Sequence, residues 1–296
     1  MISRLRGLEV RSRLVVEGAM MGLHKSPFHG ASLEFAQHRG YVPGDDLRHL
    51  DWKVYAKSDR FYVRQYEQET NLTCHFVLDM SESMGYRGGA PMSKYDYAAT
   101  LVASFAFLVT SQQDAAALTL FNDRIATTLP PKTSGGHLRA LIHTLENVTT
   151  RGLTRVGATL GPVAAHLRRR GLVVLVSDFL DDTDPLNHGL NRLRYDGHDV
   201  IVLHIADPWE RDFPFAGPSI LEGLEQTGRL VCDPLDLREV YREERQAHLD
   251  ELRALCRRLH YDFEEILTSD PFDVALGRLL IARELASGRL RRTAFK

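Results

Sequence analysis

Residues 74–83 read CHFVLDMSES, an apolar run that ends in one acidic and two hydroxyl-bearing positions. A short, continuous apolar run is typical of a parallel strand buried on both faces. Asp79, Ser81 and Ser83 follow at alternate positions, so the loop after this strand offers one carboxylate and two hydroxyls. Such oxygen ligands suit a hard divalent cation such as Mg²⁺, and the loop has no thiol or imidazole for zinc. The sequence therefore predicts a metal site at the carboxyl end of a buried strand, although serine and aspartate also serve there as helix caps and turn residues.

Beyond Asp79, apolar runs of strand length alternate with segments of helical periodicity. The expected strands are residues 115–121, 124–129, 172–177, 200–205 and 261–267. The expected helices are residues 94–111, 136–147, 156–170, 185–195, 235–259 and 271–285, with a hairpin-like insertion at 217–232. This alternation predicts an α/β fold with a doubly wound, mostly parallel sheet and helices on both faces.

Two of the predicted strands end in an aspartate, at Asp79 and at Asp178. Ligands of doubly wound sheets bind beyond the carboxyl ends of the strands, where the strand order reverses, so neighbouring strands would bring the two carboxylates together. Thr154, in a glycine-containing loop before a predicted helix, could add a hydroxyl. Two alternatives stay open: Thr154 caps that helix, or Thr159 supplies the hydroxyl instead.

Composition narrows the class of protein. The chain has 296 residues, of which 44% are hydrophobic and 26% charged, so it can bury a full core. A net charge of −2 and a pI near 6.7 give no electrostatic reason to expect nucleic acid as a partner. No apolar stretch has secretory or membrane-spanning length, and the three cysteines lack CxxC spacing. We expect a cytoplasmic protein with reduced thiols that does not insert into membranes.

The N-terminal part differs from the rest. Residues 5–23 have helical periodicity, whereas residues 24–70 carry short aromatic and charged runs interrupted by glycine and proline. This favours strands and loops over long helices. We therefore predict two domains, a smaller β-rich module with an N-terminal helix at residues 1–70 and the α/β domain at residues 71–296.

The spacing of the candidate ligands resembles the metal-ion-dependent adhesion site (MIDAS) of von Willebrand factor A domains. The resemblance implies a Rossmann-like, six-stranded sheet surrounded by helices, with Mg²⁺ at its top and Mn²⁺ or Ca²⁺ as alternatives. The ligands that it implies, with the carboxylates acting directly or through water, are Asp79, Ser81, Ser83, Thr154 and Asp178. One position departs from the pattern, because Phe179 follows Asp178 where many members of that family have glycine.

The N-terminal module closely resembles the signature of the DUF58 family of bacterial proteins. The matching segments are residues 32–35, 39–48, 51–52 and 64–69, and the resemblance extends from about residue 22 to residue 182. It implies a companion of MoxR-type AAA+ ATPases that helps to assemble or activate client proteins. Within the signature, Asp45 and Asp46 could form a charge-paired cluster with Arg39, Arg48 and Trp52 that fixes the module on the α/β domain, or could form a carboxylate pair for acid-base chemistry.

These observations predict a non-enzymatic, metal-dependent protein-binding module whose cation takes a carboxylate from a client protein. An acidic loop at residues 181–184 could attract the cation or could simply be solvated. The alternative is a metal-dependent hydrolase that uses the same cation, but the sequence contains no GxSxG, P-loop or HExxH motif, and His75 reads as a core histidine rather than a base for Ser81. A purely structural domain without metal is the third possibility.

Overall fold

The computed structural model describes residues 7–24, 38–40, 62–64, 72–167, 169–225, 228–278 and 280. The chain forms two compact units, one of residues 26–71 and the other of residues 1–25 with 72–296. In the smaller unit, β1 (His38–Gly40) pairs antiparallel with β2 (Tyr62–Arg64). The charged cluster predicted at Asp45, Asp46 and Arg48 lies outside the described residues.

The larger unit is built on a six-stranded sheet with the strand order β10-β7-β6-β3-β4-β5. Its strands are β3 (Thr73–Asp79), β4 (Ala115–Phe121), β5 (Ile125–Lys132), β6 (Leu172–Ser177), β7 (Asp199–Ala206) and β10 (Asp262–Leu267). All neighbours are parallel except β4 and β5. The antiparallel strand β5 contains Pro130 and Pro131, which an edge strand tolerates because it lacks a neighbour on one side.

The strand order reverses between β3 and β6. From β3 the chain continues to β4 and β5 on one side, and then returns to β6 on the other side of β3. Strands β3 and β6 are therefore parallel neighbours, with Leu78 opposite Val176. Their carboxyl ends deliver Asp79 and Asp178 to the same edge, as predicted from the two acid-ended strands.

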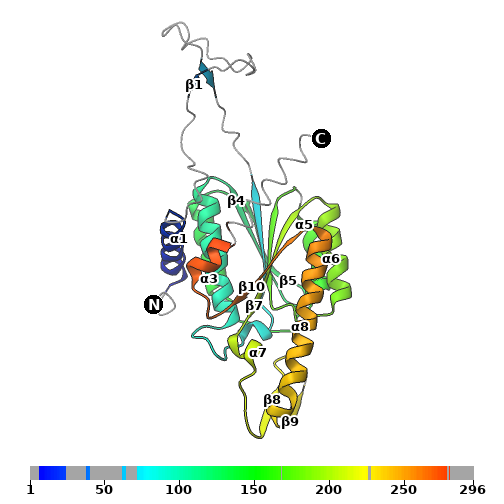
Figure 1. The fold of residues 1–296 in the computed structure, drawn as a ribbon. Coiled ribbons are helices and arrows are strands. Elements are labelled where there is room, and N and C mark those ends of the chain that lie inside the picture. Colours follow the sequence, from blue (N-terminus) through cyan, green and yellow to red (C-terminus); the bar gives the residue numbers. More distant parts are fainter. Residues whose placement is uncertain are drawn as a thin grey trace. The chain divides into compact units, whose positions relative to one another are not determined.

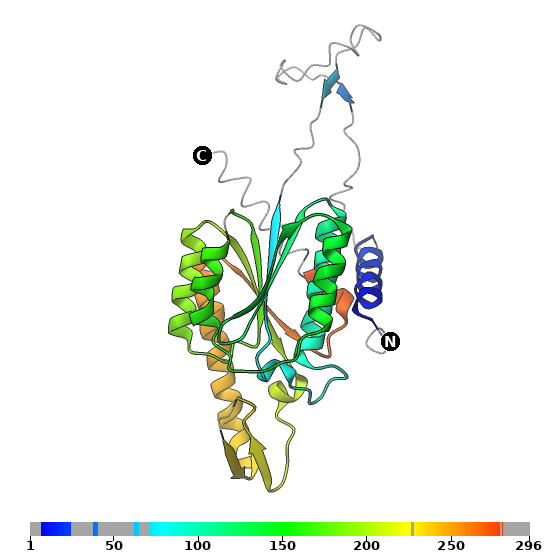
Figure 2. The ribbon, with the colours of Figure 1, turned by 180° about the vertical axis from the view of Figure 1, so that it is seen from behind.

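Helices cover both faces of the sheet (Figure 1, Figure 2). One face packs against α3 (Lys94–Ser111), α4 (Gly135–Glu146) and helical residues 272–278, and α1 (Leu8–His24) packs on α3 and α4. The other face packs against α5 (Val156–His166), α6 (Thr183–Tyr195) and α8 (Pro234–Leu259). Because side chains alternate along a strand, Phe76 and Leu78 enter the first core and Val77 enters the second.

Within the described residues the predicted elements of the larger unit are confirmed, with differences at their ends: the helix predicted at 156–170 ends at residue 166, and residues 281–285 of the last predicted helix lie outside the described residues. Helix α3 and strands β4 and β6 begin and end at the predicted residues. Two short elements were not predicted, the 3₁₀ turn η3 (Ser83–Gly85) and α7 (Pro208–Asp212). The mixed α/β architecture with a mostly parallel sheet follows from the alternating pattern of the sequence.

Helix α1 packs differently from its prediction, which placed it with the N-terminal module at residues 1–70. Its apolar residues Leu8, Val15, Val16 and Ala19 are buried in the core that includes α3 and α4. The Leu8 amide also donates a hydrogen bond to Glu146 Oε1 of α4, at 2.6 Å. The apolar stripe of α1 is therefore covered by the α/β unit, and residues 1–25 belong with residues 72–296.

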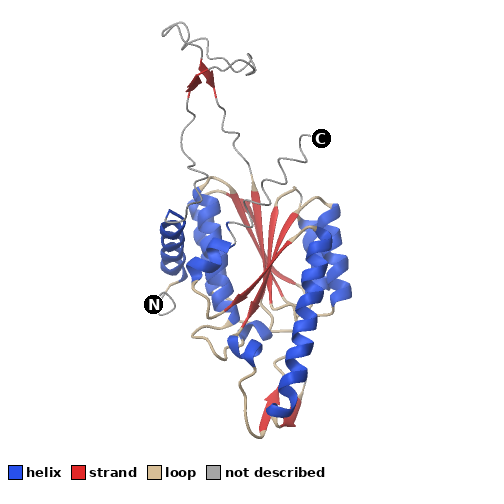
Figure 3. Cartoon of the chain, viewed as in Figure 1, coloured by secondary structure: helices blue, strands red, loops and turns tan. Residues whose placement is uncertain are grey.

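Helix α8 is 26 residues long, and its buried leucines lie in its second half. Its first half extends beyond the strands, beside the hairpin of β8 (Ser219–Glu222) and β9 (Arg229–Cys232) (Figure 3). This hairpin is a separate two-stranded sheet, as the predicted insertion at residues 217–232 suggested. In the described part of the chain, none of the helices has the length and apolar character needed to cross a bilayer.

Candidate metal centre

Asp79 ends β3 and is fully buried. Its Oδ1 accepts a hydrogen bond from the Ser81 amide at 2.8 Å, and its Oδ2 accepts one from the Ser177 hydroxyl at 2.6 Å. The loop that follows is held by its backbone, because Met80 donates to Phe121 O at 2.7 Å and Glu82 donates to Gly152 O at 2.9 Å. These contacts fix the positions of the two serine side chains.

The three candidate hydroxyls form a continuous chain. Ser81 Oγ lies 3.1 Å from Ser83 Oγ, which lies 3.1 Å from Thr154 Oγ1. All three residues are buried. Thr159, the rival of Thr154, uses its hydroxyl within α5, where it donates to Arg155 O at 2.8 Å. The structure thus brings Thr154, and not Thr159, next to the serines.

The loop that carries Thr154 needs a glycine at position 152. Gly152 has a φ of +83°, a conformation that L side chains rarely adopt. A Cβ there would lie 2.8 Å from Asn122 Nδ2, which holds the loop by donating to Arg151 O at 2.9 Å. Both the left-handed backbone conformation and the close contact with Asn122 therefore require glycine at this position of the loop.

Asp178 faces a buried ammonium group. Lys94, the first residue of α3, donates from Nζ to Asp178 Oδ2 at 2.8 Å and to Glu210 Oε1 at 2.5 Å. The side chain of Lys94 is fully buried, and that of Asp178 is 2% exposed. Glu210 is held by α7, since its Oε2 accepts from the Asp207 amide at 2.8 Å in a capping box.

The charges in this cluster are unevenly compensated. Burial alone would raise the pKa of Asp178, but the charge and hydrogen bond of Lys94 hold it below its ordinary value. Burial and the neighbouring charge of Asp178 raise the pKa of Asp79 to about 7. Burial also raises the pKa of Glu210, although Lys94 opposes this. Of Asp79 and Asp178, Asp79 is therefore the residue whose negative charge is less well compensated.

Phe179 keeps the backbone conformation for which glycine is suited. Its φ is +51°, in the left-handed region, and its side chain is fully buried in the second core. The ring stacks on His204 with centroids 6.4 Å apart, and the amide donates to Ser177 Oγ at 2.9 Å. Left-handed backbone costs a side-chain-bearing residue about 1–2 kcal/mol. Burial of the ring offsets that cost, so the departure from glycine leaves the loop folded around Asp178.

A carboxylate from the hairpin also reaches the site. Glu225, in the turn between β8 and β9, accepts hydrogen bonds from the Thr154 amide at 2.9 Å and from Thr154 Oγ1 at 2.5 Å. The chain of hydroxyls from Ser81 to Thr154 therefore ends on a carboxylate that comes from another part of the fold.

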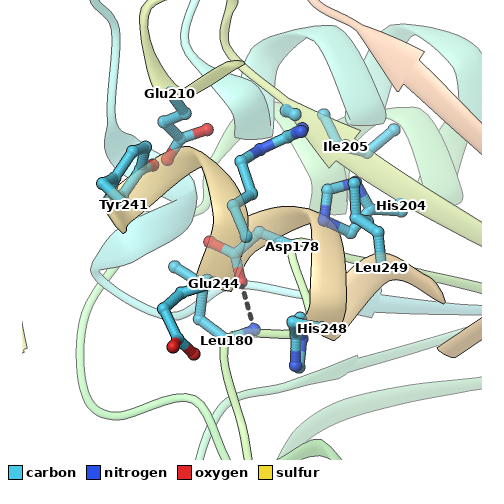
Figure 4. A pocket seen from close by; sticks show the side chains of 11 residues that line it. Asp178, Leu180, His204, Ile205, Glu210, Tyr241, Glu244, His248 and Leu249 are labelled. Carbon is cyan, nitrogen blue, oxygen red and sulfur yellow. Dashed lines mark hydrogen bonds between the residues drawn. The ribbon is translucent and has the colours of Figure 1, made fainter. Parts of the chain in front are cut away.

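A pocket of about 180 Å³ lies beside Asp178, between the ends of β6 and β7 and helix α8 (Figure 4). Leu180, Ile205 and Leu249 give it apolar walls, and its polar lining includes Asp178, His204, Glu210, Tyr241, Glu244, Arg245 and His248. Burial lowers the pKa of His204 to about 4, so its imidazole is neutral near pH 7. The pocket offers a small apolar recess next to the candidate ligands.

The acidic loop and His75 take different places in the structure. Asp181, in the acidic loop, accepts from the Gly157 amide at 3.1 Å in the first turn of α5, while Asp182 and Asp184 are exposed. His75 lies in β3, four residues before Asp79 and thus roughly 13 Å along the strand. The described residues contain no cluster of three or more His, Cys, Asp or Glu side chains that could hold a metal ion, so a site among these residues would need hydroxyl ligands as well.

Four residues of the site were not predicted from the sequence: Lys94, Ser177, Glu210 and Glu225. For Glu210 a signal existed, because Asp207-Pro208-Trp209-Glu210 has the cap, proline and acid of a capping box. Lys94 follows a helix-capping serine, and nothing in the sequence shows that its ammonium is buried. Glu225 stands in a turn, where an exposed acid is the ordinary expectation.

Comparison with known proteins places the chain in a family. A family model described as "Protein of unknown function DUF58" matches residues 37–251. Two uncharacterized proteins, Mb1516 of Mycobacterium bovis (strain ATCC BAA-935 / AF2122/97) and Rv1480 of Mycobacterium tuberculosis (strain ATCC 25618 / H37Rv), are each 29% identical over 228 residues, which are 75% of this chain and 70% of theirs.

Two solved structures are also similar. The conserved hypothetical protein BatB from Bacteroides thetaiotaomicron has 16% identity and a TM-score of 0.48, covering 73% of this chain and 98% of that chain. An aerotolerance-related membrane protein from Bacteroides fragilis NCTC 9343 has 17% identity and a TM-score of 0.45, covering 69% and 94%. Both TM-scores are below 0.5, so the fold assignment rests on the observed strand order. Because the family model matches well over half of the sequence, this chain belongs to the DUF58 family.

Proposed function

We propose that this chain is a non-enzymatic, metal-dependent protein-binding module that holds a partner through a divalent cation at the carboxyl edge of the sheet. The observation that carries the proposal is the buried chain of hydroxyls from Ser81 through Ser83 to Thr154, with Asp79 and Asp178 at the ends of the adjacent strands. Buried hydroxyls and carboxylates that converge at a sheet edge form a set of oxygen donors for a hard cation.

The donor set fits Mg²⁺, with Mn²⁺ and Ca²⁺ as alternatives. Ser81, Ser83 and Thr154 would offer hydroxyl oxygens, and Asp79 and Asp178 would act directly or through water. The six-stranded sheet with helices on both faces is consistent with the von Willebrand A-like fold that the spacing of these residues suggested. The bound cation would supply an open coordination position for a carboxylate.

Charge supports a cation here. Lys94 is shared by Asp178 and Glu210, while burial and Asp178 raise the pKa of Asp79. The three carboxylates of Asp79, Asp178 and Glu210 carry more negative charge than the one ammonium group of Lys94 can neutralise. A divalent cation would neutralise the remainder, and this matters most for buried charges.

The proposed partners are a client protein that offers a carboxylate and a MoxR-type AAA+ ATPase, in the cytoplasm. The cation would bind the carboxylate, and the recess beside Asp178, with Leu180 and Leu249 in its wall, would accept a neighbouring apolar side chain. The ATPase is proposed from the family resemblance, because DUF58 proteins look like companions of such ATPases.

In the part of the chain that the structure describes, His75 is not positioned as a base for the hydrolase alternative. The hydroxyl of Ser81 bonds to that of Ser83, and the hydroxyl of Ser83 also bonds to that of Thr154. Burial and the nearby His198 lower the pKa of His75 to about 4, and His75 lies roughly 13 Å along the strand from Asp79. Within the described residues the geometry therefore supports binding better than nucleophilic chemistry.

The test is binding of purified protein to a MoxR-type ATPase from the same organism, in Mg²⁺ and in EDTA. We expect a complex that EDTA dissociates and that Asp79→Ala abolishes. Ser104→Ala is the control, since that buried hydroxyl bonds within α3, to Thr100 O at 2.7 Å. Equal binding with and without Mg²⁺, or in Asp79→Ala, would contradict a role for the cation. Phosphoester hydrolysis by the parent that Asp79→Ala loses would instead favour the hydrolase.

A further inference from the structure

The turn between β8 and β9 places a carboxylate at the candidate metal centre. Both oxygens of Glu225 are engaged by one residue, Thr154, through its amide at 2.9 Å and its hydroxyl at 2.5 Å. Thr154 is 71 positions away in the sequence and is the last of the three candidate hydroxyl ligands. The hairpin therefore contacts the site through a group of the same chemistry as the proposed partner's carboxylate.

The direction of the hydrogen bonds leaves Thr154 able to bind a cation. Its hydroxyl donates its proton to Glu225 and accepts one from Ser83 Oγ, so one lone pair of Oγ1 remains for a cation. Neighbouring ligands of an octahedral Mg²⁺, each about 2.1 Å from the ion, lie about 3 Å apart. The 2.5 Å between Thr154 Oγ1 and Glu225 Oε1 is a short hydrogen bond, about 0.5 Å less than that separation, so the two oxygens would move slightly apart to bind one ion. A cation on Thr154 would thus have the carboxylate of Glu225 within reach.

Building on the proposed function, we infer that Glu225 is an internal ligand of the metal centre, which takes the coordination position that a partner's carboxylate requires. The resting site is then closed by the chain itself. A partner binds when its carboxylate displaces Glu225 from Thr154 and strands β8 and β9 move away with it. A partner's carboxylate would thus have to bind the cation more strongly than Glu225 does.

The hairpin is built in a way that permits this movement. Strands β8 and β9 pair with each other and not with the six-stranded sheet, and such two-stranded hairpins are marginally stable alone. Ile220 and Val231 are directly opposite one another and are 67% and 76% exposed. These side chains would lose little packing if the turn left the site.

The experiment compares Glu225→Ala with the parent and with Glu222→Ala. Glu222 lies on the same hairpin, and its Oε1 accepts from Arg229 at 2.8 Å, away from Thr154. Mn²⁺ and Mg²⁺ affinities are measured by calorimetry, and the water bound to Mn²⁺ is measured by proton relaxation, with acetate as the carboxylate probe. Circular dichroism confirms that each variant is folded.

We expect Glu225→Ala to bind Mn²⁺ at least about tenfold more weakly, as loss of a ligand group should cause. The ion should gain bound water in this variant, and acetate should displace that water at lower concentration than in the parent. Glu222→Ala should match the parent. Unchanged or tighter Mn²⁺ binding and unchanged hydration in Glu225→Ala would overturn the inference alone. A parent that binds neither cation would overturn the proposed function together with it.

Discussion

The buried ammonium of Lys94 gives the most demanding test of the site's electrostatics. Lys94→Met keeps most of the length of the side chain and removes its charge. Asp178, which is 2% exposed, and Glu210, which is 22% exposed, would then lose the cation that lies between them. Asp178 would also lose the interaction that lowers its pKa, and its buried negative charge would become unfavourable.

The expected loss of stability is large. Removing one partner of a buried ion pair costs about 3–5 kcal/mol, because the remaining charge is left without compensation. For a unit of this size each kcal/mol changes the melting temperature by about 2–4 °C, so we expect a decrease of roughly 6–20 °C. The pH dependence should change as well. In the parent, the lowered pKa of Asp178 contributes stability that is lost as pH falls below about 4, and in Lys94→Met this contribution should disappear.

The assay is thermal and urea unfolding of parent and variant, in EDTA and in Mg²⁺. At a free concentration of 100 times its Kd, a bound cation adds about 2.7 kcal/mol. We expect the shift caused by Mg²⁺ to be larger in Lys94→Met than in the parent, because no ammonium then opposes the cation. Lys132→Met is the control: Lys132 is exposed at the end of β5, and the change should stay within about 0.5 kcal/mol.

Two results would refute this reasoning. A loss of less than about 1 kcal/mol in Lys94→Met would show that the carboxylates do not depend on the ammonium. A Mg²⁺ shift equal to or smaller than that of the parent would show that the cation does not bind near these charges.

Three further predictions concern residues around the site. Phe179→Gly should destabilise the fold by about 2–4 kcal/mol in urea unfolding, because the loss of a buried phenyl ring outweighs the relief of left-handed backbone strain. The Mg²⁺ affinity measured by calorimetry should stay unchanged, and weaker Mg²⁺ binding would contradict this second expectation. Thr154→Ala should weaken Mg²⁺ binding at least about tenfold while Thr159→Ala does not, and equal calorimetric titrations would count against Thr154 as a ligand. Burial and the nearby His198 lower the pKa of His75 to about 4. Between pH 6.5 and pH 4 the imidazole is therefore protonated in the unfolded state before the folded state, which removes up to roughly 3 kcal/mol of stability. The difference in unfolding free energy between the parent and His75→Phe should fall by this amount over that range, and a difference independent of pH would contradict the prediction.

The central sheet was predictable because its strands carry a strong local signal. The continuous apolar run LVVLVS of β6 and the long apolar segment of α3 are each typical of one kind of element. Both elements begin and end at the predicted residues. The meeting of Asp79 and Asp178 followed from a rule of doubly wound sheets and did not require tertiary contacts to be known. Thr154 was preferred to Thr159 because a loop residue is free to turn toward a site, whereas a helical threonine can bond its own backbone.

Other features depend on tertiary contacts that no local pattern reveals. The apolar face of α1 predicts a helix but does not tell which unit covers it, and Leu8 and Val15 in fact pack with α3 and α4. Lys94 and Glu225 look like ordinary surface residues in the sequence, since their roles arise only when distant segments meet. Phe179 shows a further limit, because a phenylalanine in place of glycine does not reveal that its backbone adopts the left-handed conformation.

The most direct test of the account is calorimetric titration of the metal-free parent, Asp79→Ala, Ser81→Ala and the control Ser104→Ala with Mg²⁺ and Mn²⁺. We predict saturable binding of one ion to the parent and to Ser104→Ala, and its loss in the other two variants with the fold intact. Absence of binding in the parent, or binding that both Asp79→Ala and Ser81→Ala retain, would contradict the claim that these buried hydroxyls and carboxylates form a metal centre.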